Sequence, residues 1–341
     1  MKDRKFDQYS YASANVFPLK LLLHEDLIHS CIHEKKVIPI HIQLNPTNKC
    51  VFDCSFCSCS NRDRRLELPY PELISFMEKA KELGCKSVTI TGGGEPLLYP
   101  KFDEMVTALN ELGIEMGLVT NGALLDAISD DSISKMTWIR ISVSDEMPEQ
   151  LERHLGLSFD RWLKMLSNIV KNNRRVDWAF SYVVTENSKP ELIAKILKFA
   201  NEHNFTHIRL VNDIFRADQL KPVMEYIKWA IRTIYKIDDR IVNYQDRAYW
   251  TKGQNPCYIS LLKPVVDAGG YILPCCGVQY ALEKPSRDYE PSMRMGHIRD
   301  FEDLIHKQKF FDGSRCVKCY YYGYNLVLGT LLKGLKHVNF V

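Results

Sequence analysis

Six β-rich segments alternate with helical segments over the first two thirds of the chain, and this alternation constrains the fold most strongly. The β-rich segments are residues 37–44, 86–91, 114–120, 138–144, 176–185 and 207–212. Helical patterns follow them at residues 69–84, 101–113, 123–136, 159–173, 189–204 and 218–235. The alternation predicts an α/β protein with a parallel sheet and helical crossovers. Six such units suit either a doubly wound sheet or an incomplete barrel.

The unusual loops of this region all lie at the ends of predicted strands. A cysteine-rich loop follows residues 37–44, GGGEP follows 86–91, TNG follows 114–120, and SVSD ends 138–144. In both candidate architectures, catalytic and binding residues gather at the C-terminal ends of the strands. The sequence therefore predicts one site that is built from these loops.

The alternation ends near residue 240, which divides the chain into three predicted parts. Residues 1–36 form a helical extension, with helical periodicity over 18–36, and residues 37–240 form the main domain. Residues 241–341 hold five of the eleven cysteines and form a smaller module. Its predicted elements are a hairpin that turns at Gly269–Gly270, a short helix near 300–308, and an aromatic, glycine-rich tail.

Composition narrows the functional class. Of the 341 residues, 45% are apolar and 26% are charged, and the net charge of +3 is too small to indicate nucleic-acid binding, although a nucleotide as small substrate is not excluded. The chain has no apolar run of ~20 residues and no secretion signal, so we expect a cytoplasmic protein without a membrane partner. Thiols stay reduced there, so clustered cysteines are expected to be metal ligands or redox groups.

The loop NPTNKCVFDCSFCSCSNRD, residues 45–63, has the spacing C-x3-C-x2-C at Cys50, Cys54 and Cys57, with Cys59 left over. Thiolates select zinc or iron–sulfur clusters. Three closely spaced thiolates suit a cubane cluster that keeps one iron open, whereas structural zinc, the alternative, takes four protein ligands.

This spacing, with Phe56 just before the third cysteine, resembles the signature of the radical S-adenosylmethionine (radical SAM) superfamily. TGGGEP at residues 91–96 is similar to the glycine-rich motif of that superfamily, and TNG and SVSD also fit. The resemblance covers about residues 37–212 and implies a partial (β/α)6 TIM barrel.

The resemblance also implies the chemistry. Cys50, Cys54 and Cys57 would hold a 4Fe–4S cluster whose open iron binds SAM, and electron transfer would cleave SAM to a 5′-deoxyadenosyl radical that abstracts a substrate hydrogen. A flavodoxin- or ferredoxin-type partner would supply the electron. The residues implied for SAM binding are Gly92, Gly93, Gly94, Glu95, Phe56, Asn121, Ser142 and Ser144. Within this set, the glycines would let backbone approach SAM, Glu95 would accept from its ammonium, and Phe56 would lie beside the adenine. Asn121, Ser142 and Ser144 would lie near the ribose or carboxylate, although both serines also suit ordinary strand ends.

A second set of cysteines lies in the C-terminal module, at Cys257, Cys275, Cys316 and Cys319. This set, with GGYILPC, resembles the twitch module, a shortened relative of the SPASM domain, and is most similar to the aminocyclitol dehydrogenases of butirosin synthesis. The resemblance implies an auxiliary 4Fe–4S cluster, with zinc as the alternative. Cys276 is the spare thiol. Strand alternation points it away from Cys275, which favours core packing, and the alternative is a hydrogen donor to a substrate radical.

The predicted function is therefore hydrogen abstraction from a peptide or natural-product substrate, leading to oxidation, epimerisation, crosslinking or rearrangement. Residues 1–36 lack the mixed strand–helix pattern of a precursor-peptide recognition domain, which weakens a ribosomal-peptide role. The alternatives are dehydrogenation of an aminocyclitol or sugar and modification of a nucleobase or nucleoside. A non-catalytic iron–sulfur or zinc protein is the alternative from another class.

Overall fold

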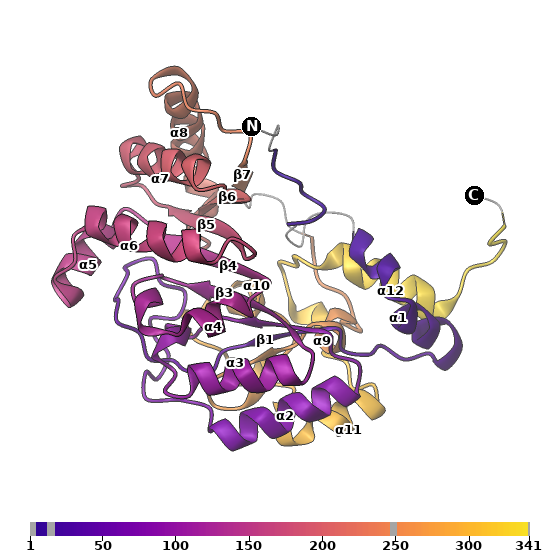
Figure 1. Cartoon of the computed structure of the whole chain (residues 1–341). Helices are drawn as coiled ribbons and strands as arrows, with labels where there is room; N and C mark the ends of the chain where they lie inside the picture. Colours follow the sequence, from indigo (N-terminus) through magenta and orange to yellow (C-terminus); the bar gives the residue numbers. More distant parts are fainter. Residues whose placement is uncertain (1–4, 12–17, 246–250, 340–341) are drawn as a thin grey trace.

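The computed structural model describes residues 5–11, 18–245 and 251–339 (Figure 1). Its strands form one ten-stranded sheet in the order β10-β9-β8-β1-β2-β3-β4-β5-β6-β7. The strands are β1 (His41–Leu44), β2 (Ser87–Ile90), β3 (Glu115–Thr120), β4 (Trp138–Val143), β5 (Asp177–Val184), β6 (His207–Asn212), β7 (Val242–Gln245), β8 (Val265–Val266), β9 (Tyr271–Leu273) and β10 (Gly296–His297).

The parallel part of the sheet contains all six predicted strands. Strands β1 to β6 pair in sequence order and in parallel, and β7 continues the series on β6. The predicted α/β class, with a parallel sheet of the partial-barrel type, is confirmed. Because β7 follows residue 240, the sheet extends beyond the predicted end of the main domain.

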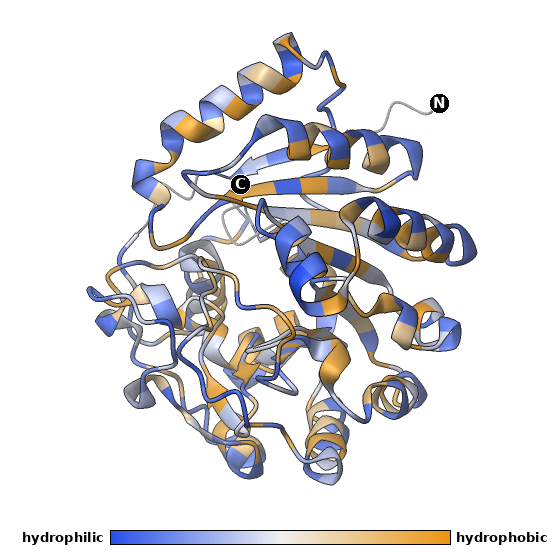
Figure 2. Cartoon of the chain, turned by 90° about the vertical axis from the view of Figure 1, so that its left-hand side faces the viewer, coloured by the Kyte–Doolittle hydropathy of each residue, from blue (hydrophilic) through white to orange (hydrophobic). Residues whose placement is uncertain are grey.

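Helices α2, α3, α6 and α7 lie along one side of the parallel strands, whereas α1 and α12 lie together away from that layer (Figure 1). The helices are α1 (Glu25–His29), α2 (Tyr70–Glu82), α3 (Phe102–Glu111), α4 (Asp130–Ser134), α5 (Met147–Leu155), α6 (Phe159–Asn172), α7 (Pro190–Glu202), α8 (Lys221–Thr233), α9 (Ile259–Leu262), α10 (Val278–Ala281), α11 (Phe301–His306) and α12 (Tyr322–Lys333). Helix α2 shows why they form: it has proline in its first turn and buries Leu73, Phe76, Met77 and Ala80 at helical spacing. Figure 2 shows hydrophobic and hydrophilic residues alternating along the helices that face the viewer.

The C-terminal module joins the sheet at β1. Strand β8 pairs in parallel with β1, and β9 pairs antiparallel with β8, which confirms the predicted hairpin. In its turn Gly270 has φ +77°, a conformation that glycine adopts without strain.

Several elements differ from the sequence-based expectation, and of the helix predicted over 123–136 only Asp130–Ser134 (α4) is α-helical. The predicted helix over 18–36 is divided into a 3-10 segment (Leu19–Leu23), α1, and a π segment (Ser30–Glu34). Helices α5 and α12 were not predicted.

Within the described residues, no helix combines the length and the apolar character that crossing a bilayer requires.

Candidate active site

The predicted cluster loop connects β1 to α2 and holds three half-buried cysteines, Cys50, Cys54 and Cys57. The Cys57 N–H donates to the Cys54 carbonyl at 3.0 Å, which closes a turn between them. Burial raises the pKa of the Cys50 thiol to about 11 and that of Cys54 to about 12. Both thiols are therefore protonated at neutral pH until a metal displaces the protons.

Cys59, which lies outside the predicted ligand set, contacts the third cysteine. Its N–H donates to Cys57 Sγ at 3.4 Å, and its thiol donates to the Gly92 carbonyl at 3.8 Å. The hydrogen bond between the two thiols raises the pKa of Cys57 and lowers that of Cys59. Cys59 thus links the cysteine loop to the glycine motif, and its exclusion from the ligands stays a prediction.

The glycine motif packs directly on the residues that precede Cys50. The Gly94 N–H donates to the Thr47 carbonyl at 3.1 Å. A Cβ at Gly93 would lie 1.8 Å from Asn48 Oδ1, and one at Gly94 would lie 2.0 Å from the Lys49 carbonyl oxygen. The contact between the two loops therefore requires these glycines, and their predicted approach to SAM stays a prediction.

Glu95 joins the glycine motif to the end of β3. Its buried carboxylate accepts from the Thr120 hydroxyl at 2.6 Å and from the N–H groups of Asn121 at 2.7 Å and Leu97 at 3.1 Å. A carboxylate has about four acceptor positions, so one remains for the predicted contact with the SAM ammonium. Burial raises the pKa of Glu95 to about 7, against these three stabilising hydrogen bonds.

This raised pKa predicts a pH-dependent stability. Between pH 4.5 and about 7 the folded chain keeps the Glu95 proton and the unfolded chain loses it, so stability falls as pH rises through this window. The effect is a few kcal/mol, at about 1.36 kcal/mol per pKa unit. Urea unfolding of the cluster-free chain at pH 5 and pH 8 is expected to show a smaller pH dependence in Glu95→Gln than in wild type. The exposed Glu111→Gln is the control, and equal pH dependence in all three proteins would contradict the prediction.

The remaining predicted SAM residues lie at the C-terminal ends of β1, β3 and β4. Phe56 is half-buried in the cysteine loop. Asn121 follows β3, and its side-chain oxygen accepts from the Ala123 N–H at 2.9 Å. Ser142 is half-buried on β4, and Ser144 is buried just past the end of that strand. The fold brings the four to one edge of the sheet, and their contacts with SAM stay predictions.

Three buried polar residues that the sequence analysis missed lie near the glycine motif: Asn48 and Arg62 adjoin Gly93, and Asn45 and Arg62 both contact Tyr289. Asn45, Asn48 and Arg62 are 1%, 6% and 6% exposed. The Arg62 guanidinium stacks on Tyr289, with Cζ 3.6 Å from the ring centroid, and Asn45 Nδ2 donates to the Tyr289 hydroxyl at 3.1 Å. Within the described ranges, Arg62 Nε and Nη1, Asn45 Oδ1 and Asn48 Oδ1 have no hydrogen-bond partner. Such buried atoms cost about 1–3 kcal/mol each when they stay unpaired.

The unpaired atoms are of the chemical kinds that bind an α-amino acid. The guanidinium donors suit a carboxylate, and the two amide oxygens suit an ammonium. Arg62 Nη1 and Asn48 Oδ1 both lie beside Gly93, and the chemistry of these two groups is compatible with the methionyl end of SAM. No spacing rule distinguishes Arg62 from its neighbours Arg64 and Arg65 in the sequence, so only the fold identifies Arg62 as a site residue.

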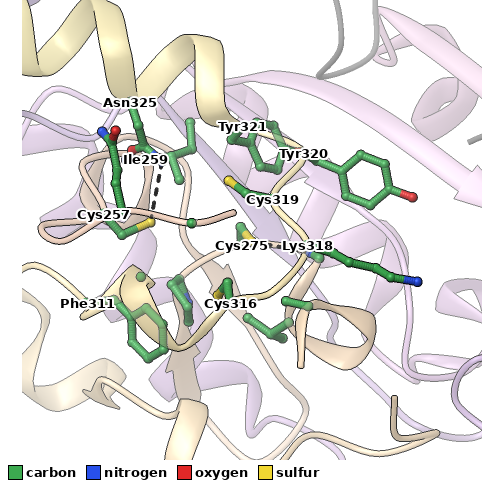
Figure 3. A pocket seen from close by; sticks show the side chains of 17 residues that line it. Cys257, Ile259, Cys275, Phe311, Cys316, Lys318, Cys319, Tyr320, Tyr321 and Asn325 are labelled. Carbon is green, nitrogen blue, oxygen red and sulfur yellow. Dashed lines mark hydrogen bonds between the residues drawn. The ribbon is translucent and has the colours of Figure 1, made fainter. Parts of the chain in front are cut away.

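The four C-terminal cysteines predicted as ligands line one cavity (Figure 3). It has about 400 Å³ of empty space, part of it open to solvent. Residues 251–257 and 311–319 build it by running side by side. The N–H groups of Gly253, Cys257 and Cys319 donate to the carbonyls of Cys316, Phe311 and Thr251 at 2.8, 2.9 and 2.7 Å.

The thiols of this cavity are neutral until a metal binds. Burial raises the pKa of Cys257 to about 12 and that of Cys316 to about 11. Within the described residues, no three Cys, His, Asp or Glu side chains converge on a single-ion site. A 4Fe–4S cluster has a separate iron for each cysteine, so its ligands need not converge in that way.

Cys276 lies beside this cavity but does not line it. Its Sγ lies 3.2 Å from the Tyr321 hydroxyl, and Tyr321 is 7% exposed. The contact is compatible with core packing, and the role of Cys276 as a hydrogen donor stays a prediction.

Comparison with known proteins identifies the domain that carries the first site. The family model described as the radical SAM superfamily matches residues 44–200. The PqqA peptide cyclase of Granulibacter bethesdensis is 23% identical over 267 residues, which are 73% of this chain and 71% of that protein. A probable GTP 3′,8-cyclase of Sulfurisphaera tokodaii is 26% identical over 240 residues, which are 66% of this chain and 73% of that protein.

The fold is also shared with a solved structure. Streptococcus suis SuiB bound to its precursor peptide SuiA aligns with a TM-score of 0.57 at 18% identity, over 88% of this chain and 73% of that one. The predicted radical SAM domain is confirmed, and the aminocyclitol dehydrogenase subgroup stays a prediction. The cysteine loop, the glycine motif and strands β2 to β5 all lie in the matched segment: residues 44–200 of this chain form a radical SAM domain, of the family that uses a 4Fe–4S cluster and SAM.

Proposed function

We propose that this enzyme abstracts a hydrogen atom from a peptide substrate. When bound, the 4Fe–4S cluster and SAM supply the one-electron chemistry for this abstraction. Cys50, Cys54 and Cys57 would be the cluster ligands, and a flavodoxin- or ferredoxin-type protein would deliver the electron. The observation that carries the SAM-dependent chemistry of this proposal is the packing of the cysteine loop on the glycine motif, beside unpaired buried groups of the kind that bind an amino acid.

The protein's own part in this reaction is to hold and orient SAM. Arg62 would bind its carboxylate, and Asn45, Asn48 and Glu95 would accept from its ammonium. Glu95 also fixes the end of β3 through Thr120 and the Asn121 N–H, so one carboxylate would align two loops of the site. Phe56, Asn121, Ser142 and Ser144 would surround the adenosine end.

The peptide substrate is supported by the relatives. Similarity to the PqqA peptide cyclase covers 73% of this chain, more than the radical SAM domain alone. The fold shared with SuiB, a protein solved with a precursor peptide, covers 88% of this chain. Oxidation, epimerisation, crosslinking and rearrangement are all outcomes that hydrogen abstraction from a peptide can initiate.

Residues 241–341 would form a twitch- or SPASM-like module with a second 4Fe–4S cluster, and residues 1–36 an N-terminal extension. Support for the second cluster comes from the cavity that Cys257, Cys275, Cys316 and Cys319 line together. Four thiols complete the ligand set of a cubane, so this site would be closed to SAM. Zinc, which also takes four thiolates, is the alternative occupant.

A nucleotide substrate is the second candidate, because the probable GTP 3′,8-cyclase is 26% identical over 66% of this chain. The net charge of +3 gives it no independent support.

The test is formation of 5′-deoxyadenosine by the anaerobically reconstituted enzyme with dithionite and SAM. We expect the product in wild type, and its absence with an intact cluster would overturn the catalytic proposal. Peptides encoded beside the gene, and GTP, are then added as deuterated substrates. Deuterium in 5′-deoxyadenosine with a peptide supports the first candidate, and deuterium with GTP alone replaces it by the second.

A further inference from the structure

Two side chains of opposite charge hold the segment between Cys54 and Cys57. Glu146, just before α5, accepts from the Ser55 N–H at 2.9 Å and also from the Ser55 hydroxyl. Arg287, in the C-terminal part of the chain, donates through Nη1 to the Ser55 carbonyl at 3.0 Å and the Cys57 carbonyl at 2.6 Å. An anionic and a cationic side chain therefore both hydrogen-bond to the segment between Cys54 and Cys57.

Arg287 is held in this position by an aromatic ring. Its Cζ lies 4.8 Å from the centroid of Phe215, in the loop after β6. Attraction between a guanidinium and a ring face restrains the long side chain. The positive charge is therefore localised at the cysteine loop.

A neutral residue makes a matched contact nearby. Gln279 of α10 donates from Nε2 to the Ser58 carbonyl. Gln279 and Arg287 both connect the C-terminal part of the chain to the cysteine loop, and only Arg287 carries charge. Substituting Gln279 therefore tests the effect of losing such a contact, and substituting Arg287 tests the added effect of losing the charge.

We infer that Arg287 and Glu146 tune the reduction potential of the SAM-binding cluster in opposite directions. The inference rests on the proposed function, in which Cys54 and Cys57 bind that cluster. Reduction adds negative charge to the cluster, so Arg287 stabilises the reduced form and Glu146 destabilises it. Charge and hydrogen bonds around the cluster are among the factors that set such potentials. Both residues act as positioning residues as well, because they fix the backbone between two ligands.

Screening by solvent limits the size of the expected change in reduction potential. Both side chains are half-buried, and water and salt screen charges at such positions. We therefore expect a change of a few fold in the ratio of reduced to oxidised cluster at a fixed potential. For a one-electron couple, a threefold change corresponds to about 28 mV, from 59 mV per tenfold.

The experiment is a redox titration of the reconstituted full-length protein, followed by electron paramagnetic resonance. The signal that changes on addition of SAM identifies the cluster. Arg287→Met is expected to lower the reduced-to-oxidised ratio about threefold, and Glu146→Gln to raise it by a similar factor. Gln279→Ala, the neutral control, is expected to leave the ratio unchanged, and the double variant Arg287→Met with Glu146→Gln to return it near wild type.

The inference would be overturned if both variants changed the reduced-to-oxidised ratio in the same direction, or if neither changed it. Loosening of the loop alone would act in the same direction in both variants, whereas an effect of charge has opposite signs. If Arg287→Met retains no iron, the Glu146→Gln shift decides alone, and anything but a rise overturns the inference. If wild type shows no SAM-responsive signal, the proposed function fails and not this inference specifically.

Discussion

Replacing Cys54 by alanine is expected to remove the SAM-binding cluster and abolish 5′-deoxyadenosine formation. A cubane that has only three protein ligands loses a corner when one thiolate is removed, and two thiolates hold it poorly in water. With two 4Fe–4S clusters, wild type holds about eight irons per chain and Cys54→Ala about four. Iron analysis and product quantification measure the two effects on the same sample.

Cys59→Ala is the matched control, because Cys59 lies in the same loop and contacts Cys57. It is expected to keep about eight irons. Cys316→Ala is expected to lose the other cluster instead and to keep the SAM-responsive signal. Loss of that signal in Cys59→Ala but not in Cys54→Ala would show the ligand assignment to be wrong. If wild type contained one zinc and about four irons, the second site would be assigned to zinc and not to an iron–sulfur cluster.

The sheet was predictable from the sequence because its strands are short, apolar and regularly separated by amphipathic helices. Helix α6 (Phe159–Asn172) illustrates this clarity: Ser158 caps its first turn by accepting from the Arg161 N–H, and Trp162 and Leu166 repeat at helical spacing on the buried face. The cysteine loop and the glycine motif were predictable for the same reason. Each follows a recognisable strand.

Helix α12 was not predictable because its local preferences oppose it. Two glycines, Gly323 and Gly329, lie within it, and glycine weakens a helix by about 1 kcal/mol relative to alanine. A Cβ at Gly329 would lie 2.7 Å from Tyr258 Cε2. Glycine is therefore needed where the helix packs on Tyr258, and tertiary packing overrides propensity. Asn325 of this helix donates to Cys257 Sγ at 3.8 Å, a contact that also has no local signature.

The residues that complete the site were invisible for a different reason. Arg62 stacks on Tyr289, and Arg287 binds the Cys57 carbonyl. These contacts join residues more than 200 positions apart, and no periodicity or spacing encodes them. The sequence supports the ligand loop itself, whereas the residues around it become evident only when the C-terminal part folds back on the cysteine loop.

Arg62 is the residue of this group with the largest expected effect on cofactor binding. Its guanidinium is buried, stacked on Tyr289 and unpaired at Nε and Nη1 within the described residues. If these donors bind the SAM carboxylate, their loss removes charge-assisted hydrogen bonds of about 1.5–3 kcal/mol. That corresponds to weaker binding by about 10- to 100-fold, at 1.4 kcal/mol per tenfold.

Arg62→Met is therefore expected to weaken SAM binding to the oxidised, reconstituted enzyme by about 10- to 100-fold in equilibrium dialysis. Decarboxylated SAM, which lacks the carboxylate, is expected to bind wild type and Arg62→Met with similar affinity, because Arg62 has no partner on it. Arg65→Met is the control, since Arg65 lies in the same loop, is exposed and pairs with Asp63 at 2.9 Å. It is expected to bind SAM like wild type. Equal losses for both ligands in Arg62→Met would mean that the substitution damages the site as a whole, and no loss for SAM would assign its carboxylate to another residue.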